Sequence, residues 1–392
     1  MKLYLFNPDS DLALAAGTEH YLAPQAVRRM AADLSLLPMW YADPGGVVRI
    51  VSASERSYLQ QMQRLFGVEL RGIVPDEWAS MRDGLTPSPW GWNLSLRRHC
   101  IEMGLPAAAL PQPEALERHR RLSARPAAVE WLERLCRWVP DCCGEAQVLG
   151  SAEACAEYAR LHPQSLFKQP WSSSGKGLRW SRGRFGPEES NWCRRAIACQ
   201  GCVVASPIYE KVCDLAMEFH LPREENGGVE FVGYSLFDTN ARGAYLGNRL
   251  VGDNAAAEAY LGQWVSVELL HEVRRRWMEL FSELGPLCTE YVGVDMMVCR
   301  RAEGYRLHPC IEVNLRMNMG VLATLFARRY LAPGVSGRFF VEGFASSEGL
   351  QRLHAERQKE RPLVVEGQRL LSGYLPLVPV TAHSRMLAYV WA

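Results

Sequence analysis

Three oxygen-bearing side chains lie on two successive strand-like segments, residues 291–298 and 306–314. They are Asp295, Glu312 and Asn314. Because side chains alternate between the faces of a strand, Glu312 and Asn314 point the same way, and Asp295 joins them if the strands pair. Hard oxygen ligands at this density suit Mg²⁺ that carries ATP phosphates. The alternative is that the three side chains cap strand ends near solvent.

A lysine and a loop of small residues precede this set. Residues 165–170 predict a short strand that places Lys168 on one side, and Leu178 begins a returning strand. The loop between them contains Ser172, Ser173, Ser174, Gly175, Lys176 and Gly177. The backbone N–H groups of such a loop can bind phosphate oxygens, and Lys168 would add positive charge. The pattern is not a P-loop, since a strand rather than a helix follows it. An ordinary Gly–Ser hairpin is the alternative.

A third segment has the pattern of an adenine-binding hinge. Residues 203–212 predict a strand that leads into a hinge, and residues 217–221 predict the next strand. Main-chain groups near Glu210, Lys211 and Val212 could meet an adenine edge, and Glu218 could accept hydrogen bonds from ribose hydroxyls. Two amphipathic strands with exposed charges are the alternative.

In this order the segments resemble the ATP-grasp superfamily over roughly residues 115–330. That family has a lysine strand, then a glycine-rich flap, an adenine hinge with glutamates, and an Asp…Glu-x-Asn metal set. The run from Glu312 to Arg316 resembles the Glu-x-Asn-x-Arg run of biotin-carboxylase-like and other carboxylate–amine ligases. The segment around Glu210, Lys211 and Glu218 resembles that of D-alanine–D-alanine ligase.

The resemblance implies an α/β protein with an ATP-grasp fold, in which the nucleotide lies between two subdomains. It implies ATP and Mg²⁺ (or Mn²⁺) as cofactors and a small carboxylate and an amine (or thiol) as substrates. The acid would be activated as an acyl phosphate, with release of ADP and phosphate. One rival is an ATP-grasp kinase that phosphorylates a small molecule, and another is a nucleotide-binding module without catalysis.

The resemblance also suggests roles for several basic residues. Arg316 would neutralise the carboxylate or the transferring phosphoryl group, and Asn318 would donate a hydrogen bond there; a helix-start pair is the alternative. Arg125 stands where many relatives carry a lysine, and it would contact phosphate as a fixed fork. An exposed helix arginine is the alternative for Arg125. Arg242 or Arg249 would meet the γ-phosphate.

Composition excludes several partners. Lys and Arg number 44 against 43 Asp and Glu, a net charge of +1. Such a balance provides no electrostatic footprint for nucleic acid or an anionic membrane. No apolar run approaches the length of a membrane span, and the first residues predict a strand rather than a signal peptide. We therefore expect a cytoplasmic protein; whether it forms a homo-oligomer stays open.

The 12 cysteines are scattered, which favours reduced thiols. Cys199 and Cys202 form a lone CxxC, and a zinc or redox site there is the alternative.

The chain divides into four predicted parts. Residues 1–115 predict an N-terminal α/β domain in which Asn93 caps a helix. The lysine-and-flap subdomain follows over 116–205, the hinge-and-metal subdomain over 206–345, and a tail over 346–392. In open α/β sheets ligands bind beyond the strand carboxyl ends, so the loop from Asn7 to Asp11 could touch the second substrate. A solvated turn before a capped helix is the alternative for that loop.

Overall fold

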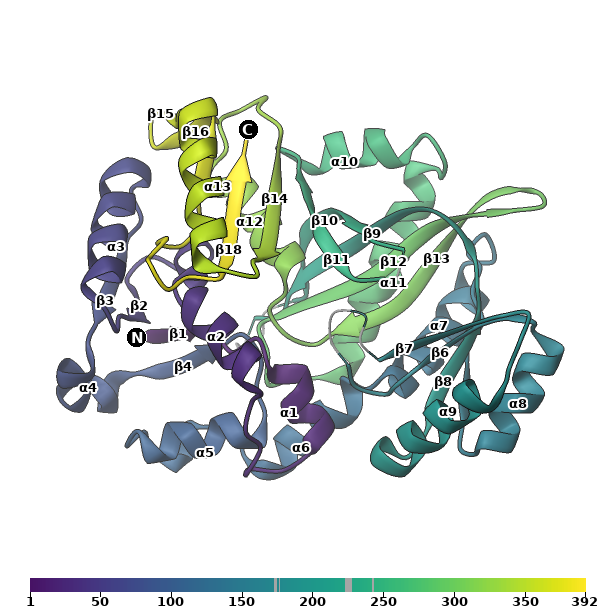
Figure 1. Ribbon diagram of the computed structural model, residues 1–392. Helices are drawn as coiled ribbons and strands as arrows, with labels where there is room; N and C mark the ends of the chain where they lie inside the picture. The colour runs from purple at the N-terminus through teal and green to yellow at the C-terminus, as the bar shows by residue number, and fades with distance from the viewer. Residues whose placement is uncertain (173–174, 176, 223–227, 242) are drawn as a thin grey trace.

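Four short parallel strands form the N-terminal sheet, in the order β3-β2-β1-β4 (Figure 1). The computed structural model describes residues 1–172, 175, 177–222, 228–241 and 243–392. The N-terminal elements are β1 (Lys2–Leu5), α1 (Ser10–Ala16), α2 (Gln25–Asp33), β2 (Gly46–Arg49), α3 (Ala53–Phe66), β3 (Leu70–Ile73), α4 (Pro75–Met81), β4 (Thr86–Pro89), α5 (Leu94–Glu102) and α6 (Pro113–Leu122). Short 3₁₀ helices η1 (Leu37–Trp40), η2 (Arg82–Gly84) and η3 (Ala107–Ala109) lie among them. This alternation confirms the predicted α/β character.

Side-chain caps fix where two of these helices begin. Asn93 Oδ1 accepts from Leu96 N at 2.9 Å, so Asn93 caps α5 as predicted. Ser52 Oγ accepts from Glu55 N at 3.2 Å at the start of α3. Each cap satisfies a backbone donor that the first helical turn leaves free.

A small antiparallel sheet holds the predicted lysine strand. Its order is β5-β8-β6-β7, with helices α8 and α9 packed together beside it (Figure 1). The elements are α7 (Arg125–Trp138), β5 (Gln147–Leu149), α8 (Ala152–Leu161), β6 (Gln164–Lys168), β7 (Leu178–Arg182), α9 (Pro187–Gln200) and β8 (Val203–Pro207). β6 and β7 pair across the small-residue loop, with Lys168 opposite Leu178. The predicted strand–loop–strand is therefore confirmed.

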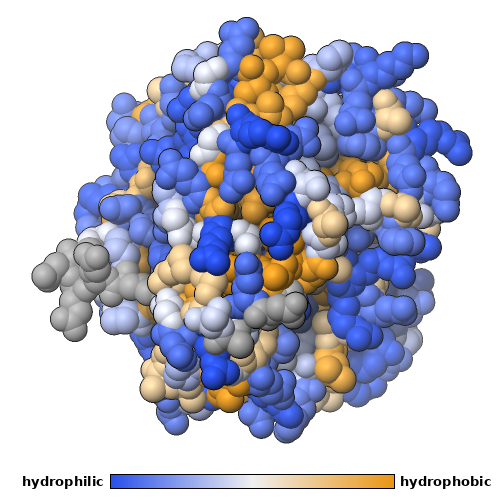
Figure 2. All heavy atoms as spheres, turned by 90° about the vertical axis from the view of Figure 1, so that its left-hand side faces the viewer, coloured by the Kyte–Doolittle hydropathy of each residue, from blue (hydrophilic) through white to orange (hydrophobic). Residues whose placement is uncertain are grey.

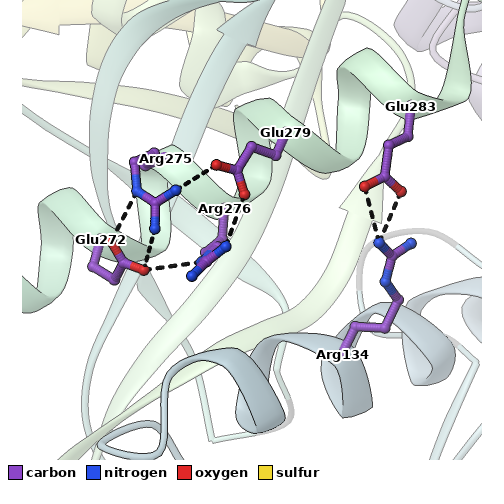
Figure 3. Close-up of polar contacts among 6 residues, drawn as sticks. All are labelled: Arg134, Glu272, Arg275, Arg276, Glu279 and Glu283. Atoms are coloured by element: carbon purple, nitrogen blue, oxygen red, sulfur yellow. Dashed lines mark hydrogen bonds and ion pairs between the residues drawn. The ribbon is translucent and has the colours of Figure 1, made fainter.

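The central sheet has eight antiparallel strands in the order β13-β12-β9-β10-β11-β14-β18-β17. Its first six strands and the helices between them are β9 (Glu210–His220), β10 (Glu230–Thr239), β11 (Tyr245–Leu250), α10 (Asn254–Leu261), α11 (Val267–Leu284), β12 (Tyr291–Arg301), β13 (Gly304–Asn314), α12 (Met319–Tyr330) and β14 (Gly337–Gly343). α7 and α11 pack against strands β9, β10, β12 and β13, where Trp277 and Phe281 are buried. On their outer side Arg134 of α7 pairs with Glu283 of α11 at 2.8 Å (Figure 3).

Residues 346–392 are not a separate tail. They form α13 (Ser347–Glu360), β15 (Val364–Glu366), β16 (Arg369–Ser372), β17 (Tyr374–Pro376) and β18 (Met386–Trp391). β18 pairs with β14 inside the central sheet, and its residues 387–390 are fully buried. The short apolar stretches of this segment were interpreted as a tail because no local sequence pattern indicates the strand with which each of them pairs.

One apolar core joins the two ends of the chain. Trp40, from the N-terminal domain, packs edge-on against Phe326 of α12, and its Nε1 donates to Leu377 O at 2.7 Å. Tyr58 of α3 donates to Pro376 O at 2.6 Å.

Figure 2 views the molecule from the side of α3: hydrophilic residues cover most of that face, and hydrophobic residues gather in a band across its middle. Among the described residues no helix is both long and apolar enough to cross a membrane.

Candidate functional site

The predicted metal ligands meet on one face of the β12–β13 hairpin. The two strands pair so that Asp295 lies opposite Glu312 and Gly293 lies opposite Asn314. Burial raises the pKa of Asp295 to about 7, and the neighbouring Glu312 carboxylate adds to the rise. A hydrogen bond from Asn314 and the charge of Arg316 oppose it. The predicted pairing of the two strands is confirmed. A bound cation would offset the repulsion between the two neighbouring carboxylates.

Glu218 lies next to this set on β9. It is 1% exposed, and it accepts from Asn318 Nδ2 at 3.0 Å. Burial raises the pKa of Glu218 to about 8 against that hydrogen bond, and the charge of Asp295 adds to the rise. Two glycines make room for the carboxylate. A Cβ on Gly293 would lie 2.4 Å from Glu218 Oε2, and one on Gly320 would lie 2.1 Å from Oε1.

Asn318 acts at a helix start. Its Oδ1 accepts from Val321 N at 2.9 Å and so caps α12. Its amide nitrogen is the one that bonds Glu218. The structure therefore shows Asn318 as a helix cap, which was the alternative role predicted from the sequence. Its predicted contact with a reacting group stays a prediction.

The predicted hinge lies elsewhere than expected. β8 ends at Pro207, and β9 runs without a break from Glu210 to His220, so the turn falls at residues 208–209. At about 3.3 Å per residue, Glu218 lies roughly 26 Å along β9 from Glu210. Glu218 therefore does not stand beside this turn, and its contact with ribose hydroxyls stays a prediction. Pairing with β10 and β12 on both sides keeps β9 continuous through the expected interruption.

The three predicted hinge residues differ in their surroundings. Glu210 is exposed and pairs with Arg300 at 3.1 Å. Lys211 donates to Asp214 Oδ2 at 2.5 Å and to Thr239 Oγ1. Val212 packs against the core between α7, α11 and the sheet. Asp214 was not predicted, and its signal is position: it shares the inward face of β9 with Ala216 and Glu218.

Two basic side chains flank the metal set from the small sheet and α7. Lys168 ends β6 and is buried; burial lowers its pKa to about 8, as does the charge of Arg125, while Glu312 opposes the change. Arg125 begins α7 and is 7% exposed, so the exposed-helix alternative is wrong. Its Nη2 donates to both oxygens of Glu312 at 2.9 and 2.8 Å, and its Nη1 donates to Gln169 O at 2.6 Å. Arg125 thus neutralises a predicted metal ligand.

Arg316 follows the metal strand directly and is held from the N-terminal domain. Its Nε and Nη2 donate to the two oxygens of Asp11, in the first turn of α1, at 2.8 and 2.7 Å. Its Nη1 donates to Met317 O at 3.2 Å. Burial disfavours the charge of Arg316, yet Asp11 raises its pKa above the ordinary value. A guanidinium has five N–H donors, and beyond these three bonds two have no partner among the residues that the structure describes. The loop containing Asp11 therefore does reach the site.

The flap is described in part. Gly175 has φ of +72°, and a Cβ there would lie 3.2 Å from the backbone of Gly243 and Ala244. At Gly177 a Cβ would lie 2.3 Å from Ser172 Cβ. Both positions therefore favour glycine. The predicted phosphate contacts Ser173, Ser174 and Lys176 lie outside the described residues, as does Arg242.

One cavity of ≈600 Å³ brings the site together. Its lining includes these predicted residues: Lys168, Gly175, Lys211, Glu218, Asp295, Glu312, Asn314, Arg316, Asn318 and Arg125. Glu210, Val212 and Gly177 are not among the described residues that line it. Arg249 lies at a separate, smaller hollow, with its guanidinium 4.9 Å from the Tyr260 ring centre, so the cavity does not include this γ-phosphate candidate.

The cysteines form no metal centre in the part of the chain that the structure describes. All 12 are free thiols there, and Cys199 is exposed on α9. Within the same residues no three His, Cys, Asp or Glu side chains gather into a metal site. The predicted Mg²⁺ site contains only two carboxylates, and its third ligand is the side-chain amide of Asn314.

Comparison with known proteins adds a fold and no sequence relative. No protein-family model matches the chain, and no curated protein is similar to it in sequence. Biotin carboxylase from Campylobacter jejuni, solved as a β,γ-ATP complex, aligns with a TM-score of 0.54 and 12% identity over 100% of this chain and 87% of that one. N5-carboxyaminoimidazole ribonucleotide synthetase from Thermus thermophilus aligns with a TM-score of 0.48 and 14% identity over 100% and 93%.

The biotin carboxylase likeness shows a shared fold. It spans the whole chain, and the resemblance seen in the Glu-x-Asn-x-Arg run pointed to the same proteins. The expected ATP-grasp fold is therefore confirmed.

Proposed function

We propose that this protein is an ATP-dependent carboxylate–amine ligase that activates its acid as an acyl phosphate. The observation that carries the proposal is the composition of one cavity. Lys168, the Asp295–Glu312–Asn314 set and Arg316 all line it, although they come from separate parts of the chain. The biotin carboxylase that shares the fold was solved with a nucleotide, which supports the choice of ATP.

The residues present fit Mg²⁺. Two carboxylates face each other across a strand pair with an amide beside them, and their mutual repulsion helps to raise the pKa of Asp295 to about 7. Asp295, Glu312 and Asn314 would hold the ion. When bound, Mg²⁺ supplies positive charge that neutralises the phosphates during transfer.

The chain's own residues would bind and position ATP. Lys168 is buried in the cavity with its pKa near 8, so at neutral pH it carries a desolvated positive charge for the outer phosphates. Gly175 presents backbone to the same cavity. The turn at residues 208–209 and the Lys211–Asp214 pair would receive the nucleoside end.

Arg316 would orient the acid. Its two remaining donors can hold the substrate carboxylate or the transferring phosphoryl group, while Asp11 fixes the guanidinium. A carboxylate oxygen attacks the γ-phosphorus, and the bond from phosphorus to the ADP oxygen breaks. The amine then attacks the acyl carbon, loses a proton and displaces phosphate. Positioning and charge neutralisation account for most of such catalysis.

The test is the identity of the nucleotide product. Purified protein is incubated with ATP, Mg²⁺, a pool of carboxylic acids and hydroxylamine as a surrogate amine. We expect a hydroxamate and an equal amount of ADP, separated by chromatography. AMP as the product would refute the acyl-phosphate mechanism. ADP with a phosphorylated acceptor and no amine dependence would instead identify a kinase. Nucleotide binding without turnover on any pool would favour a module without catalysis.

A further inference from the structure

The same cavity extends past the phosphate-binding residues to an apolar wall. Its members are Leu12, Val27, Met30, Trp90, Val341 and Met386. They come from α1, α2, the end of β4, β14 and the start of β18, so this wall is built jointly by the N-terminal domain and the last strands. The motifs that predicted ATP binding include none of these residues.

Two members of the wall, Val27 and Met30, lie on α2, and Met30 also packs against the core. α2 has no buried residue, although Val27 and Met30 lie one helical turn apart on it. Both are only half-buried, and both line the cavity. An apolar helix stripe normally faces a core. Here the stripe also borders the cavity, where an apolar occupant would cover the part of it that the core leaves uncovered.

Arg316 stands at the edge of this wall. Trp90 O accepts from Met317 N at 2.9 Å, which ties the wall to the residue after Arg316. A Cβ on Gly91 would lie 3.4 Å from Arg316 Cβ and 2.2 Å from Ser10 Oγ, so the chains approach closely here. Asp11 precedes Leu12 of the wall and holds the guanidinium. A ligand that uses the two remaining Arg316 donors therefore has apolar side chains next to it.

Three polar side chains of the central sheet that line the cavity, Ser235, Tyr245 and Asn248, are already paired with one another. Tyr245 Oη donates to Asn248 Oδ1, and Asn248 Nδ2 donates to Ser235 Oγ at 2.6 Å. These groups do not require a polar ligand. A substrate with several hydroxyl or carboxylate groups would lose hydration against the wall without regaining hydrogen bonds.

We propose that the acid substrate is a monocarboxylate with an apolar chain, whose carboxylate binds Arg316 and whose chain covers Leu12, Val27 and Met30. This inference rests on the proposed ligase function and specifies the substrate class of its site.

The test measures binding, so it does not depend on turnover. The protein is first titrated with Mg²⁺ and a non-hydrolysable ATP analogue in a calorimeter. The saturated complex is then titrated with straight-chain monocarboxylates from butanoate to octanoate and with dicarboxylates of the same lengths. Affinity should rise about fourfold per added methylene until the wall is covered, which corresponds to ~0.8 kcal/mol each. Each dicarboxylate should bind at least tenfold more weakly than its monocarboxylate.

A double variant locates the effect. Val27→Thr with Met30→Gln keeps the shapes and makes the stripe polar, and neither residue is fully buried. It should flatten the chain-length dependence and leave the affinity for the ATP analogue unchanged. Leu22→Gln is the matched control, because Leu22 is 86% exposed and does not line the cavity. It should keep the wild-type dependence.

The outcomes separate the two proposals. Failure of the ATP analogue to bind overturns the proposed function. If the analogue binds, then dicarboxylates that bind as tightly as monocarboxylates overturn the inference alone. A chain-length dependence that the double variant retains also overturns the inference. A chain-length dependence found only for alkylamines overturns it too. Absence of binding by every acid of the series overturns it as well.

Discussion

Glu218 should make the stability of the protein fall as pH rises, and Glu218→Gln should remove that dependence. The side chain is 1% exposed, and its pKa is raised from 4.5 to about 8, first by burial and then by Asp295. Below pH 4.5 the folded and unfolded states both keep the proton. Between 4.5 and 8 only the folded state keeps it, so each pH unit costs about 1.36 kcal/mol. Above pH 8 the loss is complete.

The shift corresponds to at most ~5 kcal/mol, and we expect ~3–5 kcal/mol because Asp295 shares the proton binding. In Glu218→Gln the amide oxygen still accepts from Asn318, and no group titrates. The free energy of unfolding is measured by urea denaturation at pH 5, 7 and 9, without Mg²⁺ or nucleotide. The variant's advantage over wild type should widen from pH 5 to pH 9.

Because the comparison is a difference between two proteins, the titrations of groups that do not interact with Glu218 cancel. A difference that stays constant over this range would refute a protonated, buried Glu218.

Three further changes test the site. Burial lowers the pKa of Lys168 to about 8, so the affinity of the wild-type protein for MgATP should fall as pH rises above about 8. In calorimetry, Lys168→Met should bind MgATP ~1.5–3 kcal/mol more weakly and should not show that pH dependence. In Gly320→Ala the new Cβ would lie 2.1 Å from Glu218 Oε1, so thermal melts should show a loss of ~1–3 kcal/mol of stability. Gly349→Ala, an exposed change on a helix, should lose no stability. Glu312→Gln should destabilise the nucleotide-free protein by ~1–3 kcal/mol, because a buried guanidinium loses its charged partner, and it should abolish any effect of Mg²⁺ on ATP affinity. A Glu312→Gln protein that is more stable than wild type, or that keeps its Mg²⁺ effect, would contradict that role.

The sequence predicted the parts of the site that lie close together along the chain. β12 and β13 form a hairpin, so the alternation of side chains was enough to bring Asp295 and Glu312 together. Lys168 and its returning strand are likewise separated only by the flap. Such local pairings depend on periodicity, which a single sequence displays.

Long-range contacts had no such signal. Asp11 and Arg316 are 305 residues apart, and Arg125 and Glu312 are 187 apart. No spacing rule relates the members of either pair, so charge partners of this kind follow only from the fold. β9 misled for a different reason. The sequence was divided into two strands with a hinge between them, whereas β9 runs continuously and its inward Asp214 and Glu218 face the cavity.

The shared core of the two chain ends sets an order on how this protein can be made. β18 lies between β14 and the edge strand β17 of the central sheet, and Trp40 and Tyr58 donate to the segment just before it. A nascent chain would have emerged almost to residue 390 before its first domain could bury that surface. The N-terminal part must therefore wait, partly uncovered, until residues 374–391 have been made. Protection by a chaperone during this interval would matter more here than in a protein whose domains are completed one after another.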